Sequence, residues 1–183
     1  MLDATAARDQ VVDAAAELFY SRGIQAVGMD AVRSASGVSL KRLYQLFSSK
    51  DELVIEFLRQ RDSRWQQELE VYVDARTDPL ERIAAVFDWL HGWFSENGYR
   101  GCAFINSFGE LGAISPAVAE QARHHKKAFH DYLAGLVDDA GGAAELAQQL
   151  ALLAEGAIVT SAIFAAPEAA HRARDAALSL MRR

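Results

Sequence analysis

Residues 23–53, GIQAVGMDAVRSASGVSLKRLYQLFSSKDEL, predict a short helix, a glycine turn, a second short helix and the start of a further helix. Ala31, Val32 and Ala35 give the first helix one apolar face. Gly37 follows, and its lack of a Cβ atom permits the positive φ at which a chain commonly leaves a helix. The hydroxyl of Ser39 can then cap the second helix. The stretch therefore predicts a helix-turn-helix.

The second helix of this motif has an apolar face and a basic face. Residues 31–50 contain four basic side chains and no acidic one, although the whole chain has a formal net charge of −6. A solvated basic face is the alternative for so few cations. The glycine turn and the capping serine favour an attraction to the phosphate backbone of DNA. The apolar residues are Val38, Leu43, Leu46 and Phe47, and the other face carries Leu40, Lys41, Arg42, Tyr44 and Gln45.

This part of the chain resembles the N-terminal domain of the TetR family of transcriptional regulators, over about residues 8–58. The resemblance implies an all-α homodimer with an N-terminal helix-turn-helix domain and a C-terminal helical domain for ligand binding and dimerisation. It further implies a ligand-responsive regulator, usually a repressor. The matching positions are Gly37-Val38-Ser39, Tyr44, Phe47, Lys50, Leu53 and, upstream, AAAELF at 14–19 followed by Gly23.

The resemblance places Ser39, Leu40, Lys41 and Arg42 at the base edges of DNA. Leu40 suits a thymine methyl group, and the forked guanidinium of Arg42 can bind guanine O6 and N7, or a phosphate. Position 42 is frequently a small residue in the family. We therefore expect guanine in each half of the DNA site.

Phosphate contacts are expected from Gly28, Arg33, Tyr44 and Lys50. Gly28 stands where a threonine commonly caps the first helix of the motif, and it offers backbone geometry but no hydroxyl. Arg33 replaces a usual small residue and is expected beside the DNA backbone. For Tyr44, the alternative is a core ring whose hydroxyl reaches the surface.

The rest of the chain is expected to be helical, because its 183 residues include only three prolines and no strand-like alternation of Val and Ile. The expected domains are residues 1–50, with the helix-turn-helix, and residues 51–183, for effector binding and dimerisation. No apolar run approaches the ~18 residues that cross a bilayer, and no signal peptide is apparent, so a cytoplasmic location is expected. We predict nine helices, over residues 4–22, 29–36, 39–45, 50–75, 80–97, 102–112, 116–138, 143–166 and 168–182.

An effector pocket is predicted near residues 87–108, which hold seven of the 17 aromatic residues of the chain. Aromatic walls with a few polar groups suit a mostly apolar ligand of moderate size. An ordinary aromatic core is the equal alternative on spacing alone. The family resemblance favours the pocket. Its expected lining is Trp65, Trp89, Trp93, Phe94, Cys102, Phe104, Asn106, Phe108, His125 and Phe129.

The last two predicted helices carry apolar faces with many small residues, which let helices approach closely. Two such faces can pair with their two-fold copies in a four-helix bundle, and an intramolecular core is the alternative. A two-fold dimer implies a pseudo-palindromic operator with half-sites about 34–36 Å apart, or a multiple of that distance. The expected interface residues are Leu146, Leu150, Leu153, Ala157, Phe164, Ala173, Ala177 and Leu180.

Other classes of function find little support in the sequence. No Gly-rich phosphate loop, nucleophile elbow or paired metal-ligand motif organises the polar residues, so no enzyme activity, cofactor or metal is predicted. His124, His125 and His130 do not share one helical face. The lone thiol of Cys102 is expected to be a small buried apolar group, with redox sensing as the alternative. A helical small-molecule binding protein without specific DNA reading is the main rival function.

Overall fold

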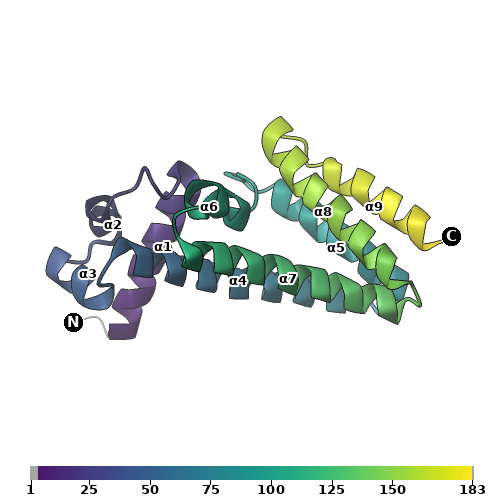
Figure 1. Ribbon diagram of the computed structural model, residues 1–183, viewed down its shortest axis with the longest axis horizontal. Helices are drawn as coiled ribbons and strands as arrows, with labels where there is room; N and C mark the ends of the chain where they lie inside the picture. The colour runs from purple at the N-terminus through teal and green to yellow at the C-terminus, as the bar shows by residue number, and fades with distance from the viewer. Residues whose placement is uncertain (1–3, 183) are drawn as a thin grey trace. The chain divides into compact units, whose positions relative to one another are not determined.

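The computed structural model describes residues 4–182, and in this range the chain is all-α with nine helices and no strand (Figure 1). The predicted fold class is therefore confirmed. The helices are α1 (Ala4–Arg22), α2 (Met29–Ser36), α3 (Leu40–Leu46), α4 (Lys50–Asp74), α5 (Pro79–Phe94), α6 (Ala103–Leu111), α7 (Pro116–Asp139), α8 (Ala144–Phe164) and α9 (Ala169–Met181).

Helix ends follow the local chemistry of the chain. The carboxylate of Asp78 accepts a hydrogen bond from the backbone N–H of Glu81 at 2.9 Å, and Pro79 occupies the first position of α5. The same helix ends at Phe94, three residues before its predicted end, and the backbone N–H of Ser95 donates to the carbonyls of His91 and Gly92 in the last turn. The end of α8 is set by Ala165, which adopts a left-handed conformation at φ 50°.

The chain divides into two compact units, and α4 and α7 contribute residues to both. The described part of the first unit comprises residues 4–63 and 103–123, and that of the second comprises residues 64–102 and 124–182. The first unit therefore contains α6 together with the helix-turn-helix.

Within the first unit, Arg8 of α1 contacts both the end of α3 and α4. Its guanidinium donates a hydrogen bond to the carbonyl of Leu46 at 3.0 Å and lies 4.2 Å from the ring centre of Phe47. It also forms an ion pair with Glu56 of α4 at 3.3 Å. One of the free carbonyls at the end of α3 is thereby satisfied, which fixes this short helix against α1 and α4.

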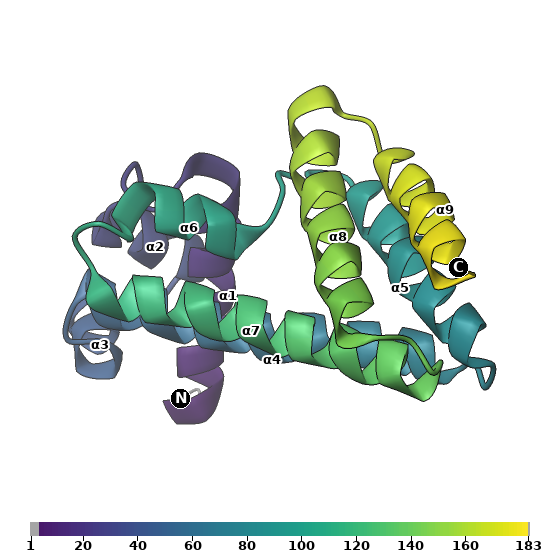
Figure 2. The same ribbon diagram turned by 45° about the vertical axis from the view of Figure 1, so that its right-hand side comes forward.

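The second unit is built around α5, α8 and α9, which pack on one another (Figures 1 and 2). Ile83 and Leu90 of α5 and Leu150 of α8 are fully buried. Among the described residues, α8 alone is long and apolar enough to cross a membrane, and a helix packed in a protein core passes the same test.

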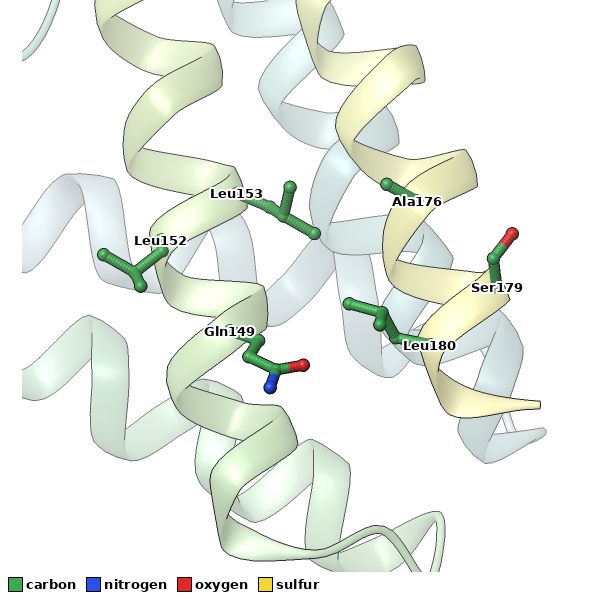
Figure 3. Close-up of a pocket in the computed structure, with 6 residues that line it drawn as sticks. All are labelled: Gln149, Leu152, Leu153, Ala176, Ser179 and Leu180. Atoms are coloured by element: carbon green, nitrogen blue, oxygen red, sulfur yellow. The ribbon is translucent and has the colours of Figure 1, made fainter. Parts of the chain in front are cut away.

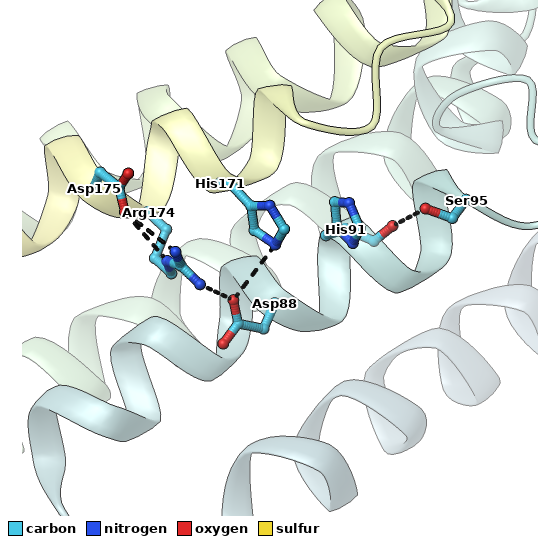
Figure 4. A network of polar contacts seen from close by, with 6 residues as sticks. All are labelled: Asp88, His91, Ser95, His171, Arg174 and Asp175. Carbon is cyan, nitrogen blue, oxygen red and sulfur yellow. Dashed lines mark hydrogen bonds and ion pairs between the residues drawn. The ribbon is translucent and has the colours of Figure 1, made fainter.

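Ion pairs link the helices of this unit at two places. Arg82 of α5 pairs with Asp74 of α4 at 2.8 Å and with Asp139 of α7 at 2.9 Å. Arg174 of α9 pairs with Asp88 of α5 at 2.6 Å (Figure 4). The hydrogen bond that the guanidinium of Arg174 donates to the carboxylate of Asp88 contributes most to raising the pKa of Arg174 above its ordinary value. Each cluster includes one pair that is distant in sequence, Arg82 with Asp139 and Arg174 with Asp88.

Candidate functional site

The turn of the helix-turn-helix has the geometry predicted from sequence. Gly37 adopts φ 67° after α2, and its N–H donates to the carbonyl of Arg33 at 3.0 Å. Ser39 has extended backbone geometry, and its hydroxyl accepts from the N–H of Arg42 at 3.3 Å. Because a Cβ is strained at such a φ, glycine is the residue that makes this turn at low cost.

Helix α3 presents an exposed face away from the core of the first unit. Leu43 is fully buried, whereas Leu40 is 44% exposed and Tyr44 is 49% exposed. Lys41 is exposed and Arg42 is half-buried. Half of the Tyr44 surface is in solvent, so its ring is not a core ring.

The four predicted phosphate-binding residues have distinct environments. Gly28 caps α2 by backbone geometry, with no side-chain hydrogen bond. Arg33 lies 3.5 Å from Asp30 in an ion pair on the same helix. The ammonium group of Lys50 donates to the carbonyl of Ile24 at 2.6 Å, a contact that was not predicted. Two of the three ammonium protons of Lys50 are left for an anion.

The start of α4 already holds a carboxylate. The N–H of Glu52 donates to the hydroxyl of Ser49 at 3.2 Å. In return, the carboxylate of Glu52 accepts from the N–H and the hydroxyl of Ser48 at 2.8 and 2.9 Å. The two hydrogen bonds from Ser48 are the main reason that the pKa of Glu52 is lowered. An anion beside this helix end would be repelled by the negative charge of Glu52.

Glu110 of α6 holds the loop that leads into the helix-turn-helix. Its carboxylate accepts from the backbone N–H groups of Ile24 at 3.1 Å and Gln25 at 2.8 Å. The side-chain amide of Gln25 donates to the carbonyl of Glu110 at 2.9 Å. A Cβ on Gly23 would lie 3.2 Å from the same carboxylate. This contact could not be predicted from the sequence, because 85 residues separate Gln25 from Glu110 and neither segment carries a local signal.

Glu110→Ala is expected to lower the free energy of unfolding by about 2 kcal/mol, because two backbone donors lose a charged acceptor. Urea unfolding and amide hydrogen exchange at Ile24 and Gln25 would measure the effect. Glu120→Ala is the matched control, because it removes an exposed carboxylate that only pairs with Arg123 on the same helix. Equal effects of the two substitutions would contradict the role of Glu110.

The aromatic residues of the predicted pocket form a connected cluster in the second unit. Trp65 contacts four rings edge-on, at centroid distances of 5.0 Å to Trp89, 5.8 Å to Trp93, 4.9 Å to His125 and 5.3 Å to Phe129. The second unit also contains Phe94 and the buried Cys102, whereas Phe104, Asn106 and Phe108 belong to α6 in the first unit.

Four of the predicted interface residues are covered by their own chain. The exposed fraction is 0% for Leu150 and Ala177, 5% for Ala157 and 7% for Ala173. Phe164 is 73% exposed, and Leu146, Leu153 and Leu180 are half-buried. These four buried side chains therefore belong to the intramolecular core, which was the alternative to a dimer interface.

A second apolar stripe of α8, missed in the sequence analysis, is open to solvent. Leu152 is 72% exposed, Val159 41% and Ile163 69%. Their spacing of seven and four residues places them on one helical face. Beside this stripe, α8 and α9 form an open, mostly apolar groove lined by Gln149, Leu152, Leu153, Ala176, Ser179 and Leu180 (Figure 3).

Histidines take part in packing and ion pairs. The rings of His91 and His171 stack with centroids 4.0 Å apart, between α5 and α9 (Figure 4). His130 lies 3.6 Å from Glu155, which pairs with Lys126 at 2.8 Å. In residues 4–182, no group of three or more His, Cys, Asp or Glu side chains could hold a metal ion.

Two family models match the chain. The model described as "Bacterial regulatory proteins, tetR family" matches residues 11–57, and the model described as "Tetracyclin repressor-like, C-terminal domain" matches residues 79–177. The second match alone covers more than half of the chain.

Individual relatives agree with these matches. The HTH-type transcriptional activator FasR of Mycolicibacterium smegmatis is 33% identical over 150 residues, which are 79% of this chain and 65% of FasR. The HTH-type transcriptional repressor KstR2 of the same species is 33% identical over 84 residues, which are 44% of this chain and 39% of KstR2. The match therefore spans less than two thirds of either relative.

A solved structure shows the same fold. The TetR-family transcriptional regulator SCO4454 from Streptomyces coelicolor superposes with a TM-score of 0.88 at 26% identity, covering 96% of this chain and 94% of that one. Proteins of this family are DNA-binding regulators and not enzymes. With a glycine turn and a serine cap before an exposed basic helix, and with models matching both halves, the chain belongs to the TetR family of transcriptional regulators.

Proposed function

We propose that this protein is a homodimeric repressor that is released from a pseudo-palindromic operator by a small, mostly apolar effector. The observation that carries the proposal is the geometry of α3. The Gly37 turn and the Ser39 cap leave Leu40, Lys41 and Tyr44 exposed on one side of a helix whose other side is buried. A helix presented in this way fits the major groove of DNA.

Base contacts are assigned to Ser39, Leu40, Lys41 and Arg42. The guanidinium of Arg42 would read guanine through O6 and N7, and Leu40 would contact a thymine methyl group. Arg42 belongs to the first turn of α3, and its backbone is fixed by the hydrogen bond that its N–H donates to Ser39. Sequence preference would then depend mainly on one arginine in each subunit.

Phosphate contacts are assigned to Gly28, Arg33, Tyr44 and Lys50. Tyr44 would donate its hydroxyl, and Lys50 would supply charge at the start of α4, where its contact with Ile24 already orients the ammonium group. The N–H groups exposed near Gly28 would take the place of the hydroxyl that a threonine supplies in other members. These contacts give affinity and register rather than sequence preference.

Dimerisation is assigned to the solvent-exposed stripe of α8 and to its groove with α9. Contiguous apolar side chains that stay in solvent in one protomer mark an interaction surface. A two-fold pair of such surfaces buries both stripes at once. It also presents two copies of α3, which explains why the operator is expected to be an inverted repeat.

The effector is assigned to the aromatic cluster around Trp65. Its rings offer a large apolar surface for an aromatic or aliphatic compound of moderate size. Ligand binding would favour one dimer conformation and operator binding another, so the difference in affinity sets the response. The named relatives include an activator and a repressor, and release by the ligand is the arrangement we propose. We further propose a cytoplasmic location. The DNA-binding domain is assigned to residues 1–50 and the effector domain to residues 51–183.

Selection of bound duplexes from a random DNA pool, at near-physiological salt, tests the proposal. Phosphate-only binding weakens steeply at that ionic strength, so a guanine-containing inverted repeat should be enriched. No enrichment would favour a helical small-molecule binding protein without specific DNA reading. With the enriched operator bound, a ligand that tightens the complex would contradict release.

A further inference from the structure

Trp65 carries a buried polar group that its surroundings leave unused. The side chain is 6% exposed, and its indole Nε1 has no hydrogen-bond partner among the described residues. An indole N–H can only donate. Buried donors are nearly always paired in proteins, so one that is not requires an explanation.

The neighbours of Trp65 explain why the N–H is unpaired. Of the four rings that contact Trp65 edge-on, Trp89, Trp93 and Phe129 offer no acceptor atom, and the imidazole of His125 is the fourth. A leucine or phenylalanine at position 65 would fill such a place without burying a polar group. A tryptophan here instead keeps a donor inside an aromatic cluster, where a hydrogen bond is stronger than in water.

The cluster is also anchored to its unit. Trp93 contacts the ring of Tyr99 edge-on at 5.2 Å, and the Tyr99 hydroxyl donates to the carbonyl of Ile158 at 3.0 Å. Trp89 and Trp93 stack on successive turns of α5 at 5.8 Å. Rings held in this way are preorganised, which lowers the entropy cost of ordering them around a flat ligand.

We propose that the Trp65 N–H is the polar contact of the effector site, and that the effector is a neutral aromatic compound with a carbonyl oxygen that accepts this hydrogen bond. This inference rests on the proposed effector function. The donor edge of an indole repels cations. Of the four rings that contact Trp65, only His125 can carry a charge, so burying an anionic ligand there would be costly.

The test uses two probes of nearly equal shape. 2-Acetylnaphthalene has a carbonyl oxygen at the position where 2-isopropenylnaphthalene has a methylene group. Calorimetry should show that the intact protein binds the ketone about tenfold more tightly, equivalent to 1.4 kcal/mol. Trp65→Phe should abolish that preference. Trp93→Phe, the same substitution in a contacting ring of the cluster, should weaken the binding of both probes alike and so keep the ratio of their affinities. Equal affinity for the two probes, or no binding of either, would overturn the proposal.

A second measurement needs no ligand. Because Trp65→Phe removes an unpaired buried donor, it should lower the melting temperature of the full chain less than Trp93→Phe does. A larger drop for Trp65→Phe would contradict the expectation that the N–H is unpaired in the free protein, which would overturn the proposal. Neither measurement uses DNA. Ketone selectivity without operator release would refute the proposed repressor mechanism alone, and release by a ligand without ketone selectivity would refute this inference alone.

Discussion

Replacing Lys41 and Arg42 together with alanine is expected to weaken binding to the selected operator by at least about 100-fold. In the proposed dimer, each subunit would lose two cations from α3, the helix to which base contacts are assigned. Alanine favours helix, and the two side chains are not part of the core, so the fold should be unaffected. Fluorescence anisotropy with a labelled operator over a series of salt concentrations would measure the loss.

The matched control for this pair is Arg123→Ala with Lys127→Ala. It removes the same charge from exposed positions on α7, where Arg123 pairs with Glu120 and Lys127 with Asp131. Operator affinity should change little, because general attraction to DNA depends weakly on two distant cations at physiological salt. An equal loss in both double variants would mean that α3 does not read the operator. Naphthyl-ketone binding should survive in both.

The features predicted correctly from sequence are those set by neighbouring residues. A glycine at position 37 and a serine at 39 determine the turn through backbone sterics and one hydrogen bond within four residues. Asp78 followed by Pro79 similarly starts α5. Such signals act over one helical turn, so they can be read without knowing the fold.

The contacts that position the helix-turn-helix could not be predicted. Arg8 reaches the carbonyl of Leu46, 38 residues away, and Glu110 reaches Ile24, 86 residues away. Each joins a charged side chain to a backbone group, and every residue has such a group. The spacing of residues along the sequence therefore does not indicate which backbone group a given charged side chain will bind.

The interface prediction failed to separate the two sides of α8, for a physical reason. This helix is apolar nearly all round, so its periodicity does not distinguish the side covered by α5 and α9 from the side left in solvent. Leu150 lies on the covered side and Leu152 on the open side, two positions apart. Only the packing of the helices in the second unit determines that Leu150 is buried and Leu152 is exposed.

Leu152→Glu with Ile163→Glu is expected to raise the dimer dissociation constant by at least about 100-fold, because each interface would bury four unpaired carboxylates. The two positions are 72% and 69% exposed in the protomer, so the monomer should remain folded. Sedimentation equilibrium would report the dissociation and circular dichroism the retained helix. Operator affinity should fall as well, because a monomer holds only one half-site.

Two comparisons make this prediction specific to the open stripe of α8. Val71→Glu with Ile114→Glu places the same charges at positions that are 68% and 75% exposed on other elements, and this variant should stay dimeric. Leu150→Ala, at a fully buried position, should lower the free energy of unfolding by about 2–5 kcal/mol. If Leu152→Glu with Ile163→Glu leaves the dimer intact while the control pair dissociates it, the two-fold contact lies elsewhere and the proposed pairing of α8 and α9 is wrong.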